Sequence, residues 1–502
     1  MAWLTAILCA TLLFLLLLLW LQPSTKGLPP GPKGLPLVGN LFDLLRYNPI
    51  EYFTLLSKEY GPIFSIQFGL RRVVVITSRH WMQQAFVRHA DTFTNRPHGT
   101  VMHFIGGGKG VVMTEGQAWR DSRRLLTLVL KEFGVGSSKI EDYIGLELPE
   151  FIETLKKEVG KPIEIHPDLA TSVLNIVWHM FAGERFKTGD PFLKWMVTSI
   201  ERTANLINQG SFLNFVPLVQ FIGTFLRPRA FQVLFSLVYR MMYFNGVIRQ
   251  HRKQLDDPTK NMDLVFAFLR EQKKIEEAHQ APGIFTDSQL RWLLSDLFVA
   301  GLDTSVSAMR WALLFIVKHP RVADKLRDEI LQVVGHDRKP CLSDRETMPY
   351  MEAFISETLR YSVVVPIITH APSHDANLGP YIIPAGTMVI TNLHGALHDP
   401  NVWENPSEFR PERFLTPEGK FFKDENLVPF SIGRRSCVGE SLARAEIFLF
   451  LTTILHTFEL KPGVDPLPPL SYVDGLFLHP QPYKIILELQ QPRHRPREPE
   501  KA

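Results

Sequence analysis

The sequence predicts a mainly α-helical protein with small β-sheets at its edges, organised as one large domain behind an N-terminal apolar segment. Three observations lead to this prediction. Residues 2–21 carry no charged side chain, long helical patterns dominate residues 146–359, and short β-type segments occur near residues 64–76, 381–389 and 483–489. A length of 502 residues alone favours several domains, but the motifs described below are spread along a single unit.

The N-terminal segment is long enough to cross a bilayer as one helix. A cleaved signal peptide is the alternative, but it needs a basic start, a shorter apolar core and a small-residue cleavage site. The segment has none of these, and Lys26 and Lys33 follow it. Basic residues after a span predict that the following chain stays in the cytoplasm. We therefore expect residues 1–22 to form a retained transmembrane anchor.

A proline-rich segment follows, with Pro29, Pro30, Pro32 and Pro36. Proline fixes φ and cannot continue a helix, so residues 23–40 are predicted to form a semi-rigid hinge between anchor and body. The body is expected to span residues 41–490. Residues 491–502 are charged and contain three prolines, which predicts a frayed C-terminal tail.

Within the body, apolar residues alternate over 64–68 and β-branched residues fill 73–76, which predicts a β-hairpin. A helix of about thirty residues is expected to begin at an N-cap formed by Thr286 or Asp287. Residues 292–317 of this helix resemble a second membrane span. They contain Asp296, Asp303 and Arg310, which are costly in lipid, so we expect a buried core helix.

Composition excludes several classes of protein. The net charge is +4, from 55 basic and 51 acidic residues, which is too balanced to indicate nucleic-acid binding. Three cysteines, Cys9, Cys341 and Cys437, do not suit a disulfide framework and indicate a reducing compartment. Residues 106–110 resemble a phosphate-binding loop but lack Ser or Thr after the lysine. No G-x-G-x-x-G dinucleotide motif is present in the sequence.

The most informative segment surrounds Cys437 and reads F-x-x-G-x-R-x-C-x-G over residues 430–439. A cysteine thiolate can be an axial ligand of haem iron, where it donates electron density and favours O–O cleavage. Glycine lets the backbone pass close to a flat ring, and the amides at the start of the next helix stabilise negative charge on sulfur. A buried structural cysteine near a helix start is the alternative.

A second informative segment is A-G-x-D-T at residues 300–304. Its i, i+4 spacing places Ala300 and Thr304 on one helix face, with Gly301 beside them. Glycine inside a helix costs about 1 kcal/mol relative to alanine, which predicts that a large group approaches closely there. The Thr304 hydroxyl and the Asp303 carboxylate could deliver protons, although a polar pair on a helix shoulder is the alternative.

These two motifs closely resemble the haem-binding signature and the oxygen-activation motif of the cytochrome P450 family. The resemblance covers the whole chain, and it is strongest to the microsomal, family-two-like branch. Two further motifs of that family are present, W-x-x-x-R at Trp119 and Arg123, and E-x-x-R at Glu357 and Arg360 with P-E-R-F downstream. The fold implied is a single haem-thiolate catalytic domain behind a transmembrane helix.

The resemblance implies haem b as cofactor and assigns residues to three sets. Cofactor contacts, with Cys437 as the metal ligand, are Cys437, Phe430, Gly433, Arg435, Gly439, Trp119, Arg123, Arg96 and His370. A buried charge network that holds the cysteine loop comprises Glu357, Arg360 and Arg413. Apolar candidates for the substrate wall are Phe104, Ile105, Leu297, Ala300, Val364, Val365 and Phe477. Four phenylalanines at 212, 215, 221 and 225 fit either membrane contact or core packing.

The activity implied is a monooxygenase that inserts one oxygen atom of O2 into a lipophilic small molecule such as a fatty acid, steroid or xenobiotic. Electrons would come from an NADPH-dependent reductase, with cytochrome b5 as a further candidate donor, at the endoplasmic reticulum membrane. Basic residues expected near the cysteine loop could dock such a partner or form a solvated surface, namely Arg124, Lys131, Lys420, Lys423 and Arg434. Two alternatives stay open, an isomerase or dehydratase of lipid peroxides and a non-catalytic membrane-anchored haem sensor.

Overall fold

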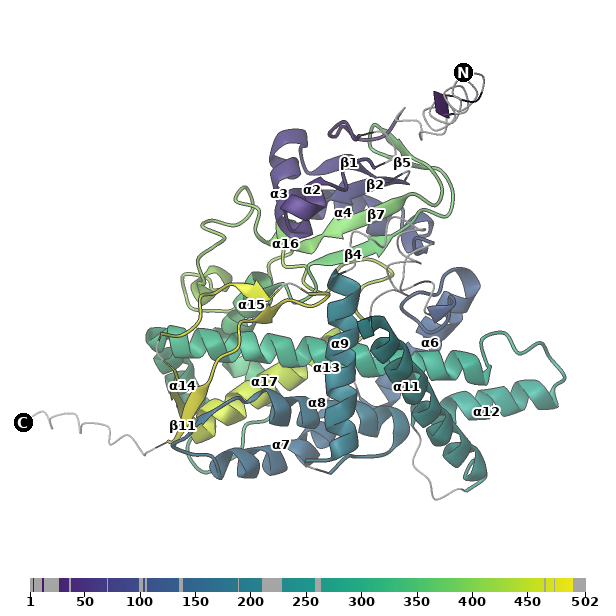
Figure 1. Ribbon diagram of the computed structural model, residues 1–502. Coiled ribbons are helices and arrows are strands. Elements are labelled where there is room, and N and C mark those ends of the chain that lie inside the picture. The colour runs from purple at the N-terminus through teal and green to yellow at the C-terminus, as the bar shows by residue number, and fades with distance from the viewer. Residues whose placement is uncertain are drawn as a thin grey trace, which may run out of the picture.

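A computed structural model describes residues 3, 11–12, 27–35, 38–69, 71–98, 103, 106–134, 139–187, 189–209, 228–257, 263–464, 466–473 and 475–490. In this part of the chain the predicted mainly helical fold with small sheets is confirmed. Figure 1 shows a helical body crossed by α13, with the sheet that contains β1 and β2 to one side. Most of the predicted anchor, Phe104, Ile105, residues 212–225 and the tail lie outside the described residues.

The helices of the described residues account for most of the molecule. They are α2 (Asp43–Arg46), α3 (Pro49–Tyr60), α4 (Arg79–Gln83), α6 (Gly116–Glu132), α7 (Ile140–Lys156), α8 (His166–Ala182), α9 (Pro191–Gln209), α11 (Pro228–Lys253), α12 (Leu264–Glu277), α13 (Asp287–Lys318), α14 (Pro320–Val334), α15 (Pro349–Ser362), α16 (Leu393–Leu397) and α17 (Glu440–Thr457). Short π- or 3-10-helical turns are η1 (Gln84–Arg88), η2 (Thr92–Thr94), η4 (Leu342–Thr347) and η5 (Pro411–Phe414).

The strands form a four-stranded sheet in the order β1-β2-β7-β4, a three-stranded sheet in the order β3-β11-β8, and two two-stranded sheets, β5-β6 and β10-β9. Their bounds are β1 (Ile63–Phe68), β2 (Arg71–Ile76), β3 (Pro162–Ile163), β4 (Ile367–His370), β5 (Ala376–Leu378), β6 (Tyr381–Ile383), β7 (Met388–Asn392), β8 (Phe458–Pro462), β9 (Tyr472–Val473), β10 (His479–Pro480) and β11 (Ile485–Leu489). The predicted hairpin is present as antiparallel β1 and β2. The segment predicted near 381–389 divides into β6 and β7, which belong to different sheets.

The proline-rich segment is fastened to the body where it is described. Ser65 on β1 donates from its backbone N–H to Pro30 O and from its hydroxyl to Pro29 O. A Cβ on Gly31 would stand 1.7 Å from Ser65 O, so only glycine fits at this contact. The prolines therefore lie against β1, and the hinge role predicted for residues 23–40 stays a prediction.

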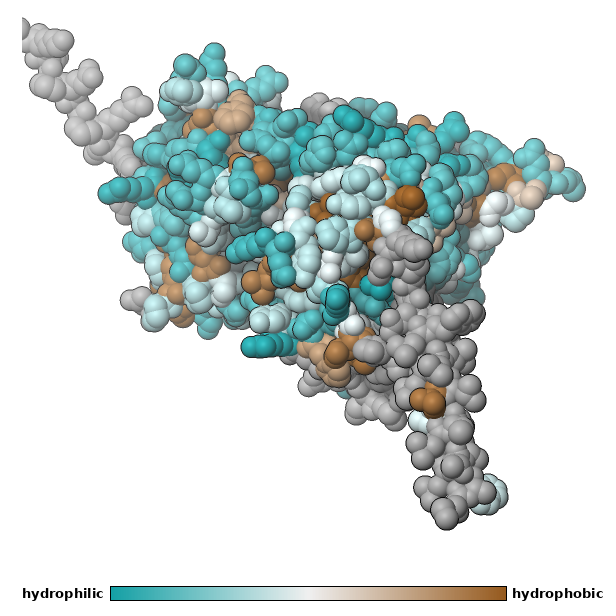
Figure 2. Space-filling view, turned by 90° about the horizontal axis from the view of Figure 1, so that it is seen from above, coloured by the Kyte–Doolittle hydropathy of each residue, from teal (hydrophilic) through white to brown (hydrophobic). Residues whose placement is uncertain are grey.

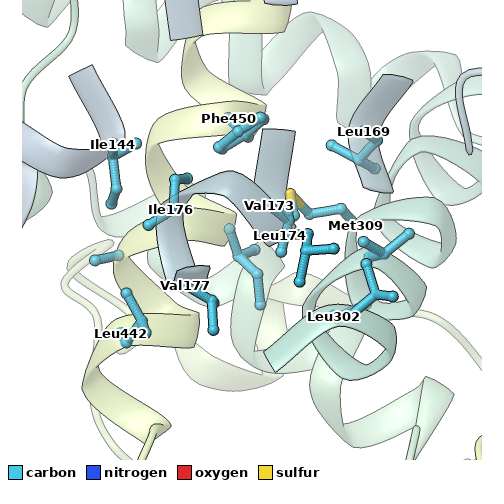
Figure 3. Packing of buried hydrophobic residues seen from close by; sticks show 14 of the residues in the cluster. Ile144, Leu169, Val173, Leu174, Ile176, Val177, Leu302, Met309, Leu442 and Phe450 are labelled. Carbon is cyan, nitrogen blue, oxygen red and sulfur yellow. The ribbon is translucent and has the colours of Figure 1, made fainter. Parts of the chain in front are cut away.

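Helix α13 is the central helix of the core. The Thr286 hydroxyl accepts from Gln289 N–H, which is the predicted N-cap. Figure 3 shows Val173 of α8, Met309 of α13 and Phe450 of α17 in one apolar cluster. Among the described residues, α13 is the one helix with the length and hydropathy of a membrane span, but 72% of its most apolar 18-residue window is buried inside the protein. The prediction of a core helix in place of a second span agrees with this burial.

A fully buried charge network joins α15 to the segment that contains η5. Arg360 and Glu357 are both 0% exposed, and the guanidinium makes two hydrogen bonds to the carboxylate, at 2.7 and 2.9 Å. Arg413 approaches the same carboxylate at 3.0 Å. Arg360 also donates to the backbone oxygens of Leu397 and Glu408. The predicted triad is thus assembled, with its surplus positive charge directed at carbonyl groups.

A second buried polar contact links α13 to α17. The Ser305 hydroxyl donates to Glu446 Oε2 at 2.7 Å. Glu446 is 1% exposed, and within the described part of the chain its other oxygen has no hydrogen-bond partner. Burial raises the pKa of Glu446 to about 8. The carboxyl group is therefore protonated at neutral pH.

Figure 2 shows one outer face of the molecule, on which hydrophilic residues dominate and hydrophobic residues occur in small scattered groups. Single exposed apolar side chains are ordinary on soluble surfaces. The coloured part of this face therefore gives no indication of a large apolar binding surface.

Replacement of Arg360 by alanine is expected to destabilise the protein by about 3–5 kcal/mol, because it leaves the Glu357 charge buried and partly unpaired. Chemical unfolding followed by circular dichroism measures the effect. Lys461→Ala is the matched control, since it removes an exposed ion pair to Glu488 worth at most about 1 kcal/mol. Equal losses in the two variants would contradict a structural role for the network.

Glu446 should make the free energy of unfolding depend on pH. Its folded pKa of about 8 lies above the 4.5 of an unperturbed glutamate, so the folded state keeps a proton that the unfolded chain releases between these values. Stability contributed by this group should therefore fall by about 1.4 kcal/mol per pH unit as pH rises from 5 to 8. Unfolding of wild type and Glu446→Gln across this range gives the difference, and parallel profiles would refute it.

Candidate active site

The cysteine loop is held by its own backbone. Cys437 N–H donates to Phe430 O at 3.0 Å, and Ser436 N–H donates to Gly433 O at 3.1 Å. Gly433 has φ of +82°, and a Cβ there would lie 2.0 Å from Phe86 O. Glycine is therefore required where the loop meets η1. Helix α17 starts directly after the loop, at Glu440.

The Cys437 thiol lines a cavity of about 270 Å³, and its exposed surface faces this cavity. Burial raises the pKa of the thiol above its ordinary value, while the amides of Gly439 and Glu440 and the charge of Arg123 oppose the rise. These groups would stabilise a thiolate. The Cys437 sulfur is thus enclosed and accepts hydrogen bonds from the Gly439 and Glu440 amides.

Helix α13 contributes a row of residues at i, i+4 spacing to the cavity wall, Ala300, Thr304 and Ala308. The Thr304 hydroxyl donates to Ala300 O at 2.7 Å. Gly301 also lines the cavity, but a Cβ on it would stand 2.8 Å from two methyl groups of Val177. Helix α8 therefore packs closely against α13 at Gly301.

Several predicted residues do not lie on the cavity wall. Asp303 is turned to another side of α13, where its carboxylate stands 3.7 Å from His479 Nε2. Phe477 is buried in the apolar core. Trp119 lies beneath Arg435, whose guanidinium carbon is 4.1 Å from the indole centre. Gly433 and Arg123 also lie off the wall. Gly433 lets the cysteine loop pack against Phe86, and the charge of Arg123 acts on the Cys437 thiol.

A cationic wall, which we define as Arg96, Arg123 and Arg435, borders the cavity. Within the described residues none of the three forms an ion pair with a carboxylate. Arg435 donates to the backbone oxygens of Thr94, Val111 and Thr114. Burial and repulsion from Arg96 and Arg123 lower the pKa of Arg435 to about 8, and burial lowers that of Arg96 to about 10. A ligand with carboxylates would remove this penalty.

His370 lies next to this wall. It lines the cavity, and its Nδ1 has no hydrogen-bond partner within the described part of the chain. Burial and the charges of Arg96 and Arg435 hold its pKa well below the ordinary value, so the ring is neutral. The residues present therefore fit haem: a cysteine sulfur for the iron, and desolvated donors for the two propionates.

The remaining wall is apolar and includes three of the predicted substrate residues, Leu297, Val364 and Val365. Other lining residues were missed by the prediction, namely Leu130, Val177, Phe181, Ser305, Leu359, Ile368, Leu393, Leu442, Ala443, Glu446 and Ile447. The apolar ones carry no local signal, because their exposure to the cavity depends on tertiary packing. Glu446 had a signal, as an acid inside an apolar helical segment.

The glycine-rich loop at 106–110 is docked on α13. Val111 and Val112 N–H groups donate to Asp296 Oδ2, at 2.7 and 2.9 Å, and Gly110 N–H donates to Gln289. Burial raises the pKa of Asp296 to about 6. Within the loop, the amide of Gly110 therefore already has an acceptor, as does the amide of Lys109, which donates to Gly106 O.

Comparison with known proteins agrees with this geometry. The family model described as cytochrome P450 matches residues 29–487. Farnesoate epoxidase of Bombyx mori is 36% identical over 492 residues, covering 95% of this chain and 97% of the relative. Cytochrome P450 2C39 of Mus musculus is 33% identical, covering 94% and 96%. Cytochrome P450 18a1 of Drosophila melanogaster is 32% identical, covering 94% and 89%.

The match of the family model spans the cysteine loop, the cavity-lining part of α13 and the buried charge network, so the site and the comparisons agree. The predicted resemblance is confirmed. The chain therefore belongs to the cytochrome P450 family, is a monooxygenase of the oxidoreductase class and binds haem as its cofactor.

Proposed function

We propose that this protein inserts one oxygen atom of O2 into a lipophilic small molecule held in the cavity, with electrons supplied by another protein. The observation that carries the proposal is that Cys437 and Thr304, from distant parts of the chain, line the same largely apolar cavity. Haem, when bound, supplies the activation and transfer of oxygen. The similarity to farnesoate epoxidase of Bombyx mori supports a lipophilic substrate.

The residues of this chain would have distinct roles. Cys437 would ligate the iron as a thiolate, and the Gly439 and Glu440 amides would stabilise its charge. Arg96, Arg123 and Arg435, together with neutral His370, would hold the propionates. Leu297, Val364 and Val365 would orient substrate and exclude water. Thr304 would hold a proton at Oγ1, at the cavity wall.

The electron donor proposed is the NADPH-dependent reductase of the same membrane, with cytochrome b5 as a further candidate. The basic residues predicted for docking, Arg124, Lys131, Lys420, Lys423 and Arg434, are all exposed. Arg434 is already ion-paired with Asp91, which leaves the other four as better candidates. Electrostatic complementarity of this kind mainly raises the association rate.

The location proposed is the endoplasmic reticulum membrane, with residues 1–22 as anchor, 23–40 as hinge, 41–490 as a cytosolic catalytic domain and 491–502 as tail. Helix α11 adds support for membrane contact, because it exposes a face of large apolar side chains: Leu234, Phe235, Val238, Tyr239 and Met242. Exposed apolar patches commonly mark contact surfaces.

Turnover of the holoenzyme with purified reductase and NADPH tests the proposal. The substrate panel is farnesoate, a twelve-carbon fatty acid, progesterone and 7-ethoxycoumarin, with products identified by mass spectrometry. NADPH-dependent incorporation of one atom from labelled O2 is the expected result. Rearrangement of a lipid hydroperoxide without NADPH would instead indicate the isomerase alternative, and no turnover with either would favour the sensor.

Replacement of Cys437 by serine should abolish the absorption band at about 450 nm that thiolate ligation produces in the carbon monoxide difference spectrum. Cys341→Ser is the matched control, because Cys341 lies outside the cavity beside Ser343 and Asp344. The control should keep the band. An unchanged band in Cys437→Ser would reject Cys437 as the ligand.

Replacement of Thr304 by alanine should keep haem content and substrate affinity but divert electrons to hydrogen peroxide. A positioned proton donor is worth roughly a hundred- to ten-thousandfold in rate, so product formed per NADPH should fall clearly. Thr304→Ser restores the hydroxyl and is the control. Coupling in Thr304→Ala equal to that of wild type would remove the proton-holding role.

A further inference from the structure

Helix α13 presents two adjacent rows of side chains with different surroundings. Ala300, Thr304 and Ala308 line the cavity. Asp303 and Ser307, each one residue before a member of that row, and Trp311, one turn after Ser307, contact the segment that contains β10. Both rows follow i, i+4 spacing, so neighbouring faces of one helix serve the cavity and this strand.

His479 on β10 contacts the second row with both ring nitrogens. Nδ1 lies 2.7 Å from the Ser307 hydroxyl, and Nε2 lies 3.7 Å from Asp303 Oδ2. The side chain of His479 is 21% exposed, whereas that of Asp303 is 5% exposed. The imidazole is therefore the more exposed of the two groups to solvent. Asp303 directly precedes Thr304, which lines the cavity.

The position of the imidazole is fixed by the strand that carries it. Trp311 Nε1 donates to Leu478 O at 3.0 Å, and Leu478 N–H donates to Val364 O at 2.8 Å. Val364 is itself a cavity-wall residue. Leu478, directly before β10, therefore links α13 to a residue of the cavity wall and holds the neighbouring His479 against α13.

We propose that His479 is the solvent-side member of a proton route that reaches the cavity by way of Asp303. The inference rests on the proposed monooxygenase function, which consumes protons in the cavity. In each passage the ring takes one proton from solvent and releases one from Nε2 to the Asp303 carboxylate. No bond to carbon changes and no electron moves. The 3.7 Å separation closes by a small ring rotation or through one water.

A purely structural ion pair is the competing explanation, since a histidine and a carboxylate at this distance would also fasten β10 to α13. Histidine differs from other pairing residues because it gains and loses protons near neutral pH. Within the described residues, titratable or charged groups near the pair include His166 on α8, which borders the same small cavity as Asp303, together with Tyr472 on β9, Arg310 on α13 and Tyr483.

The first test compares His479→Gln with wild type in the reconstituted holoenzyme. Glutamine can still hydrogen-bond Ser307 but cannot carry a proton at neutral pH. We expect product per NADPH to fall about tenfold at pH 8, less than the loss of a directly placed donor because water can bypass an outer residue. The thermal midpoint should stay within a few degrees. A lowered midpoint with unchanged coupling would overturn the proposal in favour of a structural pair.

Two further variants sharpen the result. His479→Ala should regain coupling when free imidazole is added, and failure of this rescue would overturn the route. His456→Gln is the matched control, because His456 bonds Gly335 O at 2.8 Å, at the other end of α17 from the cysteine loop. It should not change coupling, and an equal loss there would show that the effect is not specific to the His479 position.

The second test does not depend on turnover. The ring signal of His479 is identified in the labelled holoenzyme by its absence from His479→Gln, and its titration is followed by NMR. Removal of the carboxylate in Asp303→Asn should lower the pKa of His479, because a nearby negative charge favours the imidazolium. An unchanged titration would overturn the contact itself. If wild type fails to oxygenate any substrate while this shift is present, the proposed function fails and the contact stands.

Discussion

The buried contact of Arg360 with Glu357 and Arg413 is the interaction on which the catalytic half of the molecule depends. Two guanidinium groups share one carboxylate, and the remaining donors reach backbone oxygens of Leu397, Glu404 and Glu408. Desolvation of such charges is expensive unless every donor is satisfied. The network therefore fixes the path of the chain from 397 to 413, a segment that precedes the cysteine loop in the sequence.

The cavity wall has a positively charged part and an apolar part. Arg96, Arg123 and Arg435 bring positive charge to a site that offers no carboxylate of its own within the described residues, and the amides around Cys437 favour a negative sulfur. Other parts of the wall are formed by apolar side chains such as Leu297 and Val365. Arg96, Arg123 and Arg435 would hold the propionates of haem and Cys437 its iron, and the apolar wall would remain for the substrate.

Elements with strong local patterns were predictable from the sequence. The hairpin at β1 and β2, the capped helix α13 and the cysteine loop could be predicted from spacing and residue type, whereas the buried network was implied only by the resemblance to the family. Short strands such as β4, β9 and β10 could not, because two to four residues carry no periodicity and pairing comes from distant segments. Asp303 illustrates a further limit: its identity was informative, but only tertiary packing decides that its carboxylate faces His479.

The same limit applies to Gly301, for which the residue type indicated a close approach without showing which neighbour approaches. The neighbour closest to a Cβ placed at position 301 would be the side chain of Val177 on α8. Glu446 was overlooked for the reverse reason, since a single acid in an apolar helix has no partner in its own segment. Its partner Ser305 lies 141 positions away on α13.

The acidic and basic residues of α13 also bear on how the chain is synthesised. This helix has the length and hydropathy of a membrane span, and two of the helices that pack on it, α15 and α17, follow it in the chain. A charged residue near the centre of a candidate span disfavours insertion by about 2.5–3.5 kcal/mol. Asp296, Asp303 and Arg310 would therefore disfavour insertion of the nascent helix into a bilayer.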